Sequence, residues 1–314
     1  MSGAPAVSVV IPTRDGAARV PQVLEALLAD AGAVPFEVVV VDNASRDGTT
    51  ATVDRHPATA ALRAAGVEVR VVPEARPGLT FARARGVEAA RAEAVCFLDD
   101  DNLPEPGYLA CGAAAMEDPS VGVLTSRVYP EYLAEPPAAV ARREHLLAIN
   151  HLMGDDPVDW GAGSEPVPTL GAGMWVRRAA FAEAAAGGQV LSDRTGAGLS
   201  SGGDIEIGVA LGRAGYRRLY LPGLRLRHLI PPGRLETRYF CRLIYGIVRS
   251  RLAVEAVYAG RGGRPRDRAA ALARLAGAVA ALPALLARRD GAREALFVLV
   301  SRWAELRGPL RGRL

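Results

Sequence analysis

Three consecutive acidic residues, Asp99, Asp100 and Asp101, directly follow a short apolar run that ends at Leu98. Adjacent carboxylates repel one another, and the end of an apolar strand gives them no cover, so a cation is expected to compensate their charge. Carboxylate oxygens are the ligands that hard divalent cations such as Mg²⁺ prefer. The acidic cluster therefore predicts a divalent metal site.

Polar residues also follow two earlier apolar runs, with Thr13-Arg14-Asp15 after the first and Asp42-Asn43 after the second. Short, mostly β-branched runs alternate with amphipathic stretches, which predicts strands alternating with helices. That alternation indicates a mainly parallel sheet covered on both faces, with ligands bound beyond the carboxyl ends of its strands. We therefore expect the three polar segments to meet at one site. The expected strands are 7–11, 36–41, 67–72 and 94–98.

The composition is that of a folded protein: 314 residues, half of them apolar, can bury a sizeable core. The three cysteines are widely spaced and fit neither a disulfide framework nor a zinc motif, so reduced thiols are expected. No charged segment followed by an apolar core opens the chain, and no uncharged stretch reaches the roughly 18 to 20 residues of a membrane span. The expected location is the cytoplasm, either free or peripheral at the inner membrane face.

The end of the chain is strongly basic. From Arg249 onward it contains 14 arginines and five acidic residues, whereas the net charge of the whole chain is only +4. Two apolar stretches, 272–287 with Pro283 inside it and 295–303, lie among these arginines. They predict a helical pair that rests on an anionic membrane surface, or else a hairpin that packs on the body or self-associates. Nucleic acid is disfavoured as a partner, because no recognised motif or aromatic interleaving is present.

The first part of the chain contains four notable segments in order: VSVVIPTRDGAARVPQVLEALL, FEVVVVDNASRDGTT, RPGLTFARARGVEAA and AVCFLDDDNLPEPGYL. Together they closely resemble the nucleotide-binding half of the family 2 glycosyltransferases, and segments 171–181 and 200–232 are similar to that family's acceptor half. The resemblance implies the GT-A fold, a Rossmann-like, mainly parallel α/β sheet. It divides the chain into a GT-A domain at 1–250, with a nucleotide-sugar half at 1–104 and an acceptor half at 105–250. A basic helical extension at 251–314 follows.

The same resemblance implies which residues bind the nucleotide sugar. Asp42 matches an acidic residue that contacts the nucleoside, and Asn43 stands where a second aspartate is commoner. The other expected donor-binding residues follow strand ends or lie on a helix that faces the same crevice; they are Pro12, Thr13, Arg14, Arg83, Asp99 and Asp100. A forked guanidinium such as that of Arg83 could pair with the base or the diphosphate.

The resemblance also implies a metal set, because Asp99 and Asp101 match the outer members of the family's Asp-x-Asp motif. Asp101 is expected to ligate Mg²⁺ or Mn²⁺ directly, together with phosphate oxygens of the donor. Asp99 is expected to contact the ribose or to reach the metal through water. His228, at the end of an expected strand, matches a metal-facing histidine and is the expected third ligand.

Asp204 is the expected catalytic base. It follows Ser200-Ser201-Gly202-Gly203 at the predicted start of a helix over 205–214, where a simple helix cap is the alternative role. Gly203 stands where the family often has glutamate, and Glu206 is the fallback base. Trp175 and Trp160 are expected either in an acceptor wall or in the core.

These assignments imply an inverting, metal-dependent glycosyltransferase of the hexosyltransferase type. It would move a sugar from a nucleoside-diphosphate sugar to an acceptor hydroxyl, with a lipid-linked or glycan acceptor favoured by the basic end of the chain. The alternative is a non-catalytic nucleotide-sugar-binding or scaffold protein on the same fold, with Gly203 and Asn43 as marks of a decayed site. A sugar nucleotidyltransferase is disfavoured because the Gly-rich first loop and activating lysine are missing, and a dinucleotide-dependent oxidoreductase because no G-x-G-x-x-G follows the first strand.

Overall fold

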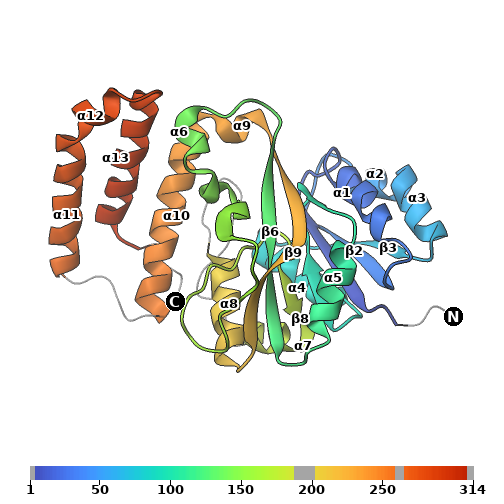
Figure 1. Cartoon of the computed structure of the whole chain (residues 1–314). Helices are drawn as coiled ribbons and strands as arrows, with labels where there is room; N and C mark the ends of the chain where they lie inside the picture. Colours follow the sequence, from blue (N-terminus) through green and yellow to red (C-terminus); the bar gives the residue numbers. More distant parts are fainter. Residues whose placement is uncertain (1–3, 187–201, 259–264, 310–314) are drawn as a thin grey trace.

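The computed structural model describes residues 4–186, 202–258 and 265–309. A central sheet has helices on both of its faces, and a group of helices stands at one end of the molecule (Figure 1). Ser200 and Ser201, part of the segment expected before the helix of Asp204, lie outside the described residues.

The first part of the chain forms the parallel part of the sheet. β1 pairs in parallel with both β2 and β4, and β2 pairs in parallel with β3. All four expected strands are confirmed, and their ends differ by one or two residues from the expected ranges. Thr13 and Asp42 are the last residues of their strands rather than the first residues of the loops. The strands are β1 (Val7–Thr13), β2 (Phe36–Asp42), β3 (Glu68–Pro73) and β4 (Ala94–Phe97).

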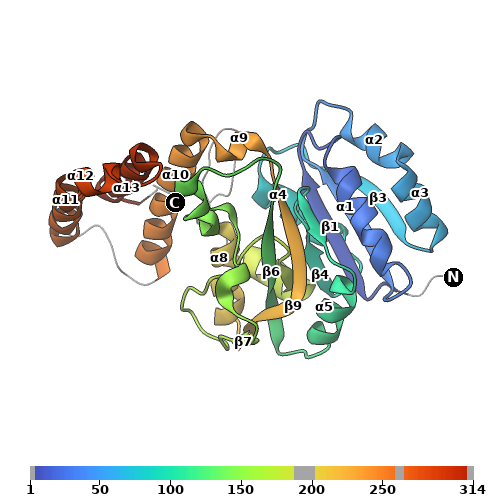
Figure 2. The same cartoon turned by 45° about the horizontal axis from the view of Figure 1, so that its top comes forward.

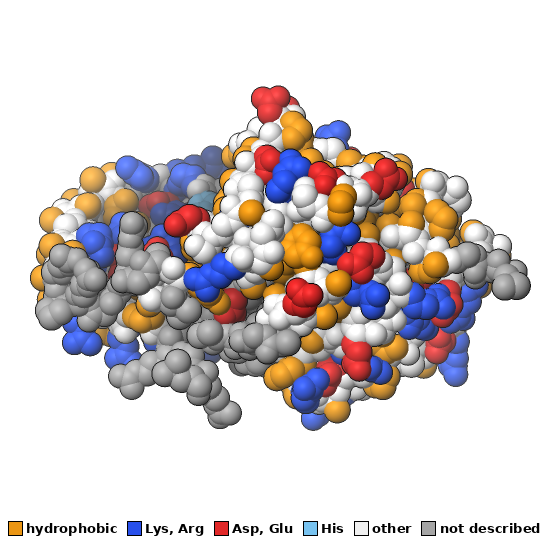
Figure 3. All heavy atoms as spheres, turned by 90° about the horizontal axis from the view of Figure 1, so that it is seen from below, with side chains coloured by type: hydrophobic (Ala, Val, Ile, Leu, Met, Phe, Trp, Pro, Cys, Tyr) orange, Lys and Arg blue, Asp and Glu red, His pale blue; other side chains and the backbone are white. Residues whose placement is uncertain are grey.

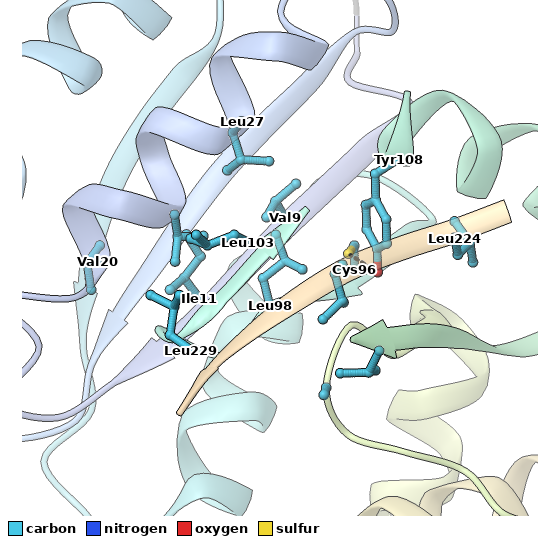
Figure 4. Close-up of a cluster of buried hydrophobic side chains, with 14 of the residues drawn as sticks. Val9, Ile11, Val20, Leu27, Cys96, Leu98, Leu103, Tyr108, Leu224 and Leu229 are labelled. Carbon is cyan, nitrogen blue, oxygen red and sulfur yellow. Dashed lines mark hydrogen bonds between the residues drawn. The ribbon is translucent and has the colours of Figure 1, made fainter. Parts of the chain in front are cut away.

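Helices cover the two faces of these strands because alternate side chains point to opposite sides of a sheet. Val9 and Ile11 pack with the apolar face of α1 (Val20–Leu27), as Figure 4 shows for Val20 and Leu27. On the other face, Val10 packs with α4 (Leu79–Ala89). The helices α2 (Thr49–Arg55) and α3 (Pro57–Ala64) lie beyond β3 on the outer side (Figure 2).

The second part of the chain extends the sheet with antiparallel and parallel pairs. The strand order is β3-β2-β1-β4-β8-β6-β9-β5, and β7 pairs with β9. β9 is long and parallel to β6, while β5 lies antiparallel on its other side. The sheet is therefore mixed and mainly parallel, as expected. The elements are β5 (Asn102–Pro104), α5 (Tyr108–Met116), β6 (Val121–Tyr132), α6 (Ala138–Ala141), β7 (Val158–Asp159), β8 (Trp175–Arg177), α7 (Arg178–Ala186), α8 (Gly203–Arg213), β9 (Arg217–Ile230) and α9 (Pro232–Leu235).

Trp175 belongs to the core of this sheet. Its side chain is fully buried, and its indole Nε1 donates to the hydroxyl of Tyr108 over 3.2 Å. Buried Trp and Tyr side chains usually need such a polar partner. Gly173 makes the neighbouring turn possible, since its φ is +66° and a Cβ there would lie 2.5 Å from the Tyr108 hydroxyl.

After α9, the described part of the chain contains α10 (Thr237–Tyr258), α11 (Pro265–Ala280), α12 (Leu282–Leu286) and α13 (Gly291–Arg307). α10 runs through residue 250, where the body and the extension were expected to meet. Pro283 lies in the first turn of α12, which fits the fixed φ and missing N–H of proline. In Figures 1 and 2 this group lies at the end of the molecule opposite α2 and α3.

The last helix is attached to the body by burial and by charge. Phe297 of α13 is buried with its ring centroid 5.0 Å from that of Phe240 on α10. Glu294 accepts hydrogen bonds from Arg142 and Arg143, which follow α6. Large apolar side chains nevertheless remain exposed on these helices, and basic side chains lie beside apolar ones at this end in Figure 3. The exposed apolar residues are Leu272, Val279, Leu286, Leu296 and Trp303. Within the described residues, no helix combines the length and apolar character needed to cross a membrane.

Candidate active site

A cavity of about 460 Å³ lies beyond the carboxyl ends of β1, β2 and β4. This is the edge at which ligands bind in parallel α/β sheets. The structure brings the expected residues together there, with the exception of Asp42. Those lining the cavity are Pro12, Thr13, Arg14, Arg83, Asp99, Asp100, Asp101, Asp204 and His228.

The middle aspartate of the cluster is engaged by the protein itself. Thr13 donates its hydroxyl to Asp100, and Arg19 donates to both carboxylate oxygens, at 3.0 and 2.8 Å. Such a forked pair fixes the orientation of a carboxylate as well as neutralising it. Asp100 therefore ties the end of β4 to the loop after β1, while Asp99 and Asp101 lie on either side of it.

Asp101 lies beside His228 because of the way β5 pairs with β9. Asn102, the first residue of β5, is directly opposite His228, and the backbone N–H of Leu229 donates to the Asp101 carbonyl over 2.9 Å. The His228 Nε2 is 3.6 Å from Asp101 Oδ1, and both side chains are more than nine-tenths buried. His228 is inside β9 rather than at its end, since the strand continues to Ile230.

A residue without a sequence prediction, Arg234 of α9, completes this corner. Its Nη2 donates to Asp101 Oδ2 over 2.7 Å, and its Nη1 lies 2.8 Å from His228 Nε2. Burial alone would lower the pKa of Arg234, but the carboxylates of Asp101, Asp99 and Asp100 outweigh it and raise that pKa. Arg234 is thus a firmly charged cation within the cavity lining.

Arg83 and Asp204 both lie close to Gly171. Arg83 of α4 is 3% exposed, and its Nη2 lies 3.7 Å from Asp99 Oδ1. A Cβ on Gly171 would be 2.4 Å from that same Nη2, so only glycine allows the guanidinium to come this close. The Gly171 N–H in turn donates to Asp204 Oδ2 over 2.9 Å. One glycine therefore positions both the arginine and the proposed base.

Asp204 lies in the first turn of α8, as the sequence predicts. The N–H of Ile205 donates to its Oδ1 over 2.9 Å, so each carboxylate oxygen accepts one backbone hydrogen bond. Each carboxylate oxygen has two lone pairs and can accept more than one hydrogen bond. The fallback base, Glu206, is 2% exposed and accepts a hydrogen bond from the hydroxyl of Tyr258 on α10. Glu206 is not among the residues that line the described cavity.

Asp42 does not line the cavity, whereas its neighbour Asn43 does. Asp42 accepts from the Ser45 N–H and from the Thr50 hydroxyl; these bonds outweigh burial and lower the pKa of Asp42. Asn43 lines the cavity. Its amide donates to the carbonyls of Glu74 and Arg76 and accepts from the Gly78 N–H. An aspartate could not make the two donor contacts, which explains the amide at this position physically.

The charge of the lining bears on the expected metal. Among the described residues, five carboxylates line the cavity against three arginines, and pairing Arg19 with Asp100 still leaves one carboxylate in excess. A diphosphate would be repelled by this excess unless a further cation accompanied it. The oxygens of Asp99 and Asp101 and the imidazole of His228 are suitable donors for Mg²⁺ or Mn²⁺. No described group of three such side chains is already arranged around a metal position. The residues therefore fit a cation that they share with the phosphates of a ligand.

The residues that sequence reasoning missed act through their neighbours in space. Arg234 lies six residues beyond His228 in the sequence, directly after Pro231-Pro232-Gly233 and within α9. Arg19 directly precedes α1, and no motif in the sequence marks it as a site residue. A signal did exist for Gly171, in the glycine-rich segment 171–181. Trp160 and Trp175 do not line the described cavity.

Comparison with known proteins places this chain in a family. Residues 8–181, more than half of the chain, match the glycosyl transferase family 2. An uncharacterized protein of Sinorhizobium fredii is 30% identical over 131 residues, or 41% of this chain, and one of Mycobacterium tuberculosis is 34% identical over 119 residues, or 38%. The chain matches only 14% and 35% of the lengths of these two relatives.

Solved structures match over nearly the whole chain. The mannosyltransferase PcManGT of Pyrobaculum calidifontis, in complex with GDP-Man and Mn²⁺, is similar with a TM-score of 0.59 and 19% identity. That match covers 97% of this chain and 88% of PcManGT. TarS of S. aureus in complex with UDP-GlcNAc has a TM-score of 0.52 and 15% identity, over 95% of this chain and 90% of TarS. These likenesses confirm the fold, and the family match confirms the resemblance seen in the sequence. The chain belongs to glycosyl transferase family 2 and has its GT-A fold.

Proposed function

We propose that the protein transfers a sugar from a nucleoside-diphosphate sugar to an acceptor hydroxyl, with inversion at the anomeric carbon and with a divalent cation. The observation that carries the proposal is that Asp99, Asp101 and His228 line the same cavity as Asp204. A cation-binding group for the leaving diphosphate and a candidate base for the acceptor thus share one site.

The donor half of the site is assigned to the end of β1, the end of β2 and α4. Arg83 presents a buried guanidinium that suits the diphosphate, and Thr13 and Arg14 line the same wall. Asp42, at the end of β2 and outside the cavity lining, is proposed to contact the nucleoside. The ligands GDP-Man and UDP-GlcNAc in the two structural neighbours support a nucleotide-sugar donor of this kind.

In the proposed reaction the acceptor oxygen attacks the anomeric carbon from the face opposite the diphosphate. Asp204 takes the hydroxyl proton as the new C–O bond forms. The bond between the anomeric carbon and the diphosphate breaks, and its electron pair stays on the diphosphate oxygen. Asp101, with Asp99 and His228, would hold a divalent cation, which when bound would supply positive charge to stabilise this leaving group. Arg83 adds fixed positive charge nearby.

The acceptor is proposed to be a lipid-linked or cell-surface glycan. The support is indirect: the C-terminal helices combine exposed apolar side chains with an excess of arginine, which suits an anionic membrane surface. Because the chain matches only part of its curated relatives, the acceptor and the pathway remain part of the proposal.

The test is a thermal-shift screen of the purified protein against UDP-, GDP- and dTDP-sugars, each with and without Mn²⁺. We expect one nucleotide class to raise the melting temperature only when the metal is present, because ligands that bind the folded state alone stabilise it. Asp101→Ala should lose that metal-dependent shift, whereas Asp156→Asn, an exposed acidic residue outside the cavity lining, should keep it. Stabilisation without any transfer to glycan or lipid-linked acceptors would favour the non-catalytic alternative.

A further inference from the structure

Arg234 occupies the place between the two side chains that were expected to share a metal. Its guanidinium bridges Asp101 Oδ2 and His228 Nε2 at 2.7 and 2.8 Å. A guanidinium has donors and no acceptor, so the His228 Nε2 must be the accepting, unprotonated nitrogen. The lone pair of His228 and the carboxylate of Asp101 therefore both point at one cation, which in this structure is an arginine.

The other nitrogen of His228 supports this description of the ring. If Nε2 accepts, the proton of the neutral imidazole is on Nδ1, which is buried without a hydrogen-bond partner. A buried donor without a partner costs free energy. The hydrogen bond from Arg234 to Nε2 offsets this cost and favours the observed ring orientation. The chain holds His228 with its accepting nitrogen toward the cavity, where a cation is its natural partner.

An arginine and a divalent cation cannot both occupy that position. A metal that ligates Asp101 and His228 needs the same lone pairs that Arg234 now engages. The Arg234 side chain is 23% exposed and lines the cavity, so it can leave this pair toward the space proposed for the diphosphate. A guanidinium fork matches phosphate oxygens as well as it matches a carboxylate.

We propose that Arg234 is a built-in competitor of the metal, which holds Asp101 and His228 until a nucleotide draws its guanidinium away. This inference rests on the proposed function, because the nucleotide that draws Arg234 away is taken to be a nucleoside diphosphate like the proposed donor. Metal and nucleotide binding are then coupled: each favours the state in which Arg234 has released Asp101, and the coupling is reciprocal. The protein binds the metal weakly alone and strongly together with the donor.

The experiment measures Mn²⁺ binding to the full chain by electron paramagnetic resonance, with Mn²⁺ alone and then with UDP or GDP. Removing the competitor in Arg234→Met should tighten binding of Mn²⁺ alone at least about tenfold, the worth of one charged hydrogen bond. The nucleotide that binds should tighten Mn²⁺ binding more in the wild type than in the variant. Arg227→Met removes the same charge from β9 outside the cavity lining, where Arg227 pairs with Glu131, and should change neither value.

Two further variants keep the result interpretable. Asp101→Asn combined with Arg234→Met should abolish the gain, which shows that the added affinity uses Asp101. Arg234→Lys keeps a charge opposite Asp101 if the methionine variant does not fold. Its single ammonium cannot bridge both partners, so it should give a smaller gain in the same direction.

Unchanged or weaker binding of Mn²⁺ alone in the folded Arg234 variants would overturn the proposal, because a purely structural arginine predicts no gain. The outcome is separable from that of the proposed function. Tighter Mn²⁺ binding with no binding of either nucleotide would keep the competition and count against the transferase. Metal-dependent nucleotide binding, with the affinity for Mn²⁺ alone unchanged in the Arg234 variants, would support the transferase and overturn the competition between Arg234 and the metal.

Discussion

Asp204 is held by two backbone N–H groups, those of Gly171 and Ile205, and this arrangement makes its role testable. In Asp204→Asn the amide oxygen can still accept from one of these N–H groups, while the amide nitrogen cannot accept from the other, so the basic group is lost together with one backbone hydrogen bond. We expect turnover to fall by about 10²- to 10⁴-fold, the usual worth of a positioned base, with donor affinity unchanged. Steady-state rates and donor titrations measure the two effects separately.

The control is Asp156→Asn, which makes the same chemical change at an exposed position. It should leave both the rate and the donor affinity as they are. Loss of donor binding in a folded Asp204→Asn protein would assign Asp204 to the donor rather than to the acceptor hydroxyl.

At the residue scale, sequence reasoning found the side chains that follow strand ends, because topology alone brings those ends to one edge. Asp99, Asp101 and Thr13 are of this kind. Arg234 could not be found in that way, since only the pairing of β5 with β9 carries Asp101 to His228 and so to Arg234. The contacts of the Asn43 amide were equally hidden, because they depend on which carbonyls of the 74–78 loop come within reach.

At the scale of elements, α13 is fastened to the segment after α6 by one buried carboxylate. Hydrogen bonds from Arg143 outweigh burial, and with those from Arg142 they lower the pKa of Glu294 to about 2. Because the folded-state pKa is below the unfolded one, the contribution to stability is present above about pH 4.5 and is lost as the pH falls toward 2. The attachment of the C-terminal helices is therefore acid-sensitive.

Glu294→Gln should lower the free energy of unfolding at pH 7 by about 1 to 3 kcal/mol, the range for hydrogen bonds to charged groups. The difference from the wild type should shrink steadily between about pH 5 and pH 2, where the wild-type carboxylate itself becomes protonated. Denaturant unfolding at several pH values measures it. Glu117→Gln, at an exposed site, is the matched control. A difference that is the same at pH 7 and at pH 2.5 would show that the charge of Glu294 is not what matters.

The strands could be placed from the sequence because each is a β-branched run bounded by turn residues. The helices at the end of the chain could be predicted as helices, but their packing could not. Whether an apolar residue of 272–303 faces another helix or solvent depends on partners far away in the chain. Phe297 meets Phe240, while Trp303 on the same helix remains half exposed.

At the scale of the whole molecule, the C-terminal helices lie at the end opposite α2 and α3 (Figure 1) and carry exposed apolar side chains. Basic side chains lie beside apolar ones at this end (Figure 3). The proposal of a membrane face predicts sedimentation with vesicles that contain phosphatidylglycerol, weaker binding to phosphatidylcholine alone, and release by salt. Replacing Leu272 and Trp303 together by serine should reduce the bound fraction severalfold, because less apolar area enters the interface.

Leu152→Ser is the control for the vesicle experiment, since Leu152 is the most exposed large apolar residue described but lies outside the C-terminal helices. It should leave vesicle binding unchanged. Equal binding by all variants would argue against this face, and a change in oligomeric state of the Leu272 and Trp303 variant would favour self-association instead.

The hydrogen bond between Tyr258 and Glu206 has a consequence for dissecting the protein. Glu206 is on the helix that begins with Asp204, whereas Tyr258 is the last residue of α10. A polypeptide shortened at residue 250 would keep every residue that lines the described cavity and still lose the Tyr258 hydroxyl that donates to the buried Glu206. Loss of that bond would weaken the helix that carries Asp204, so inactivity of such a fragment would be no sign that the helices beyond α10 take part in the chemistry.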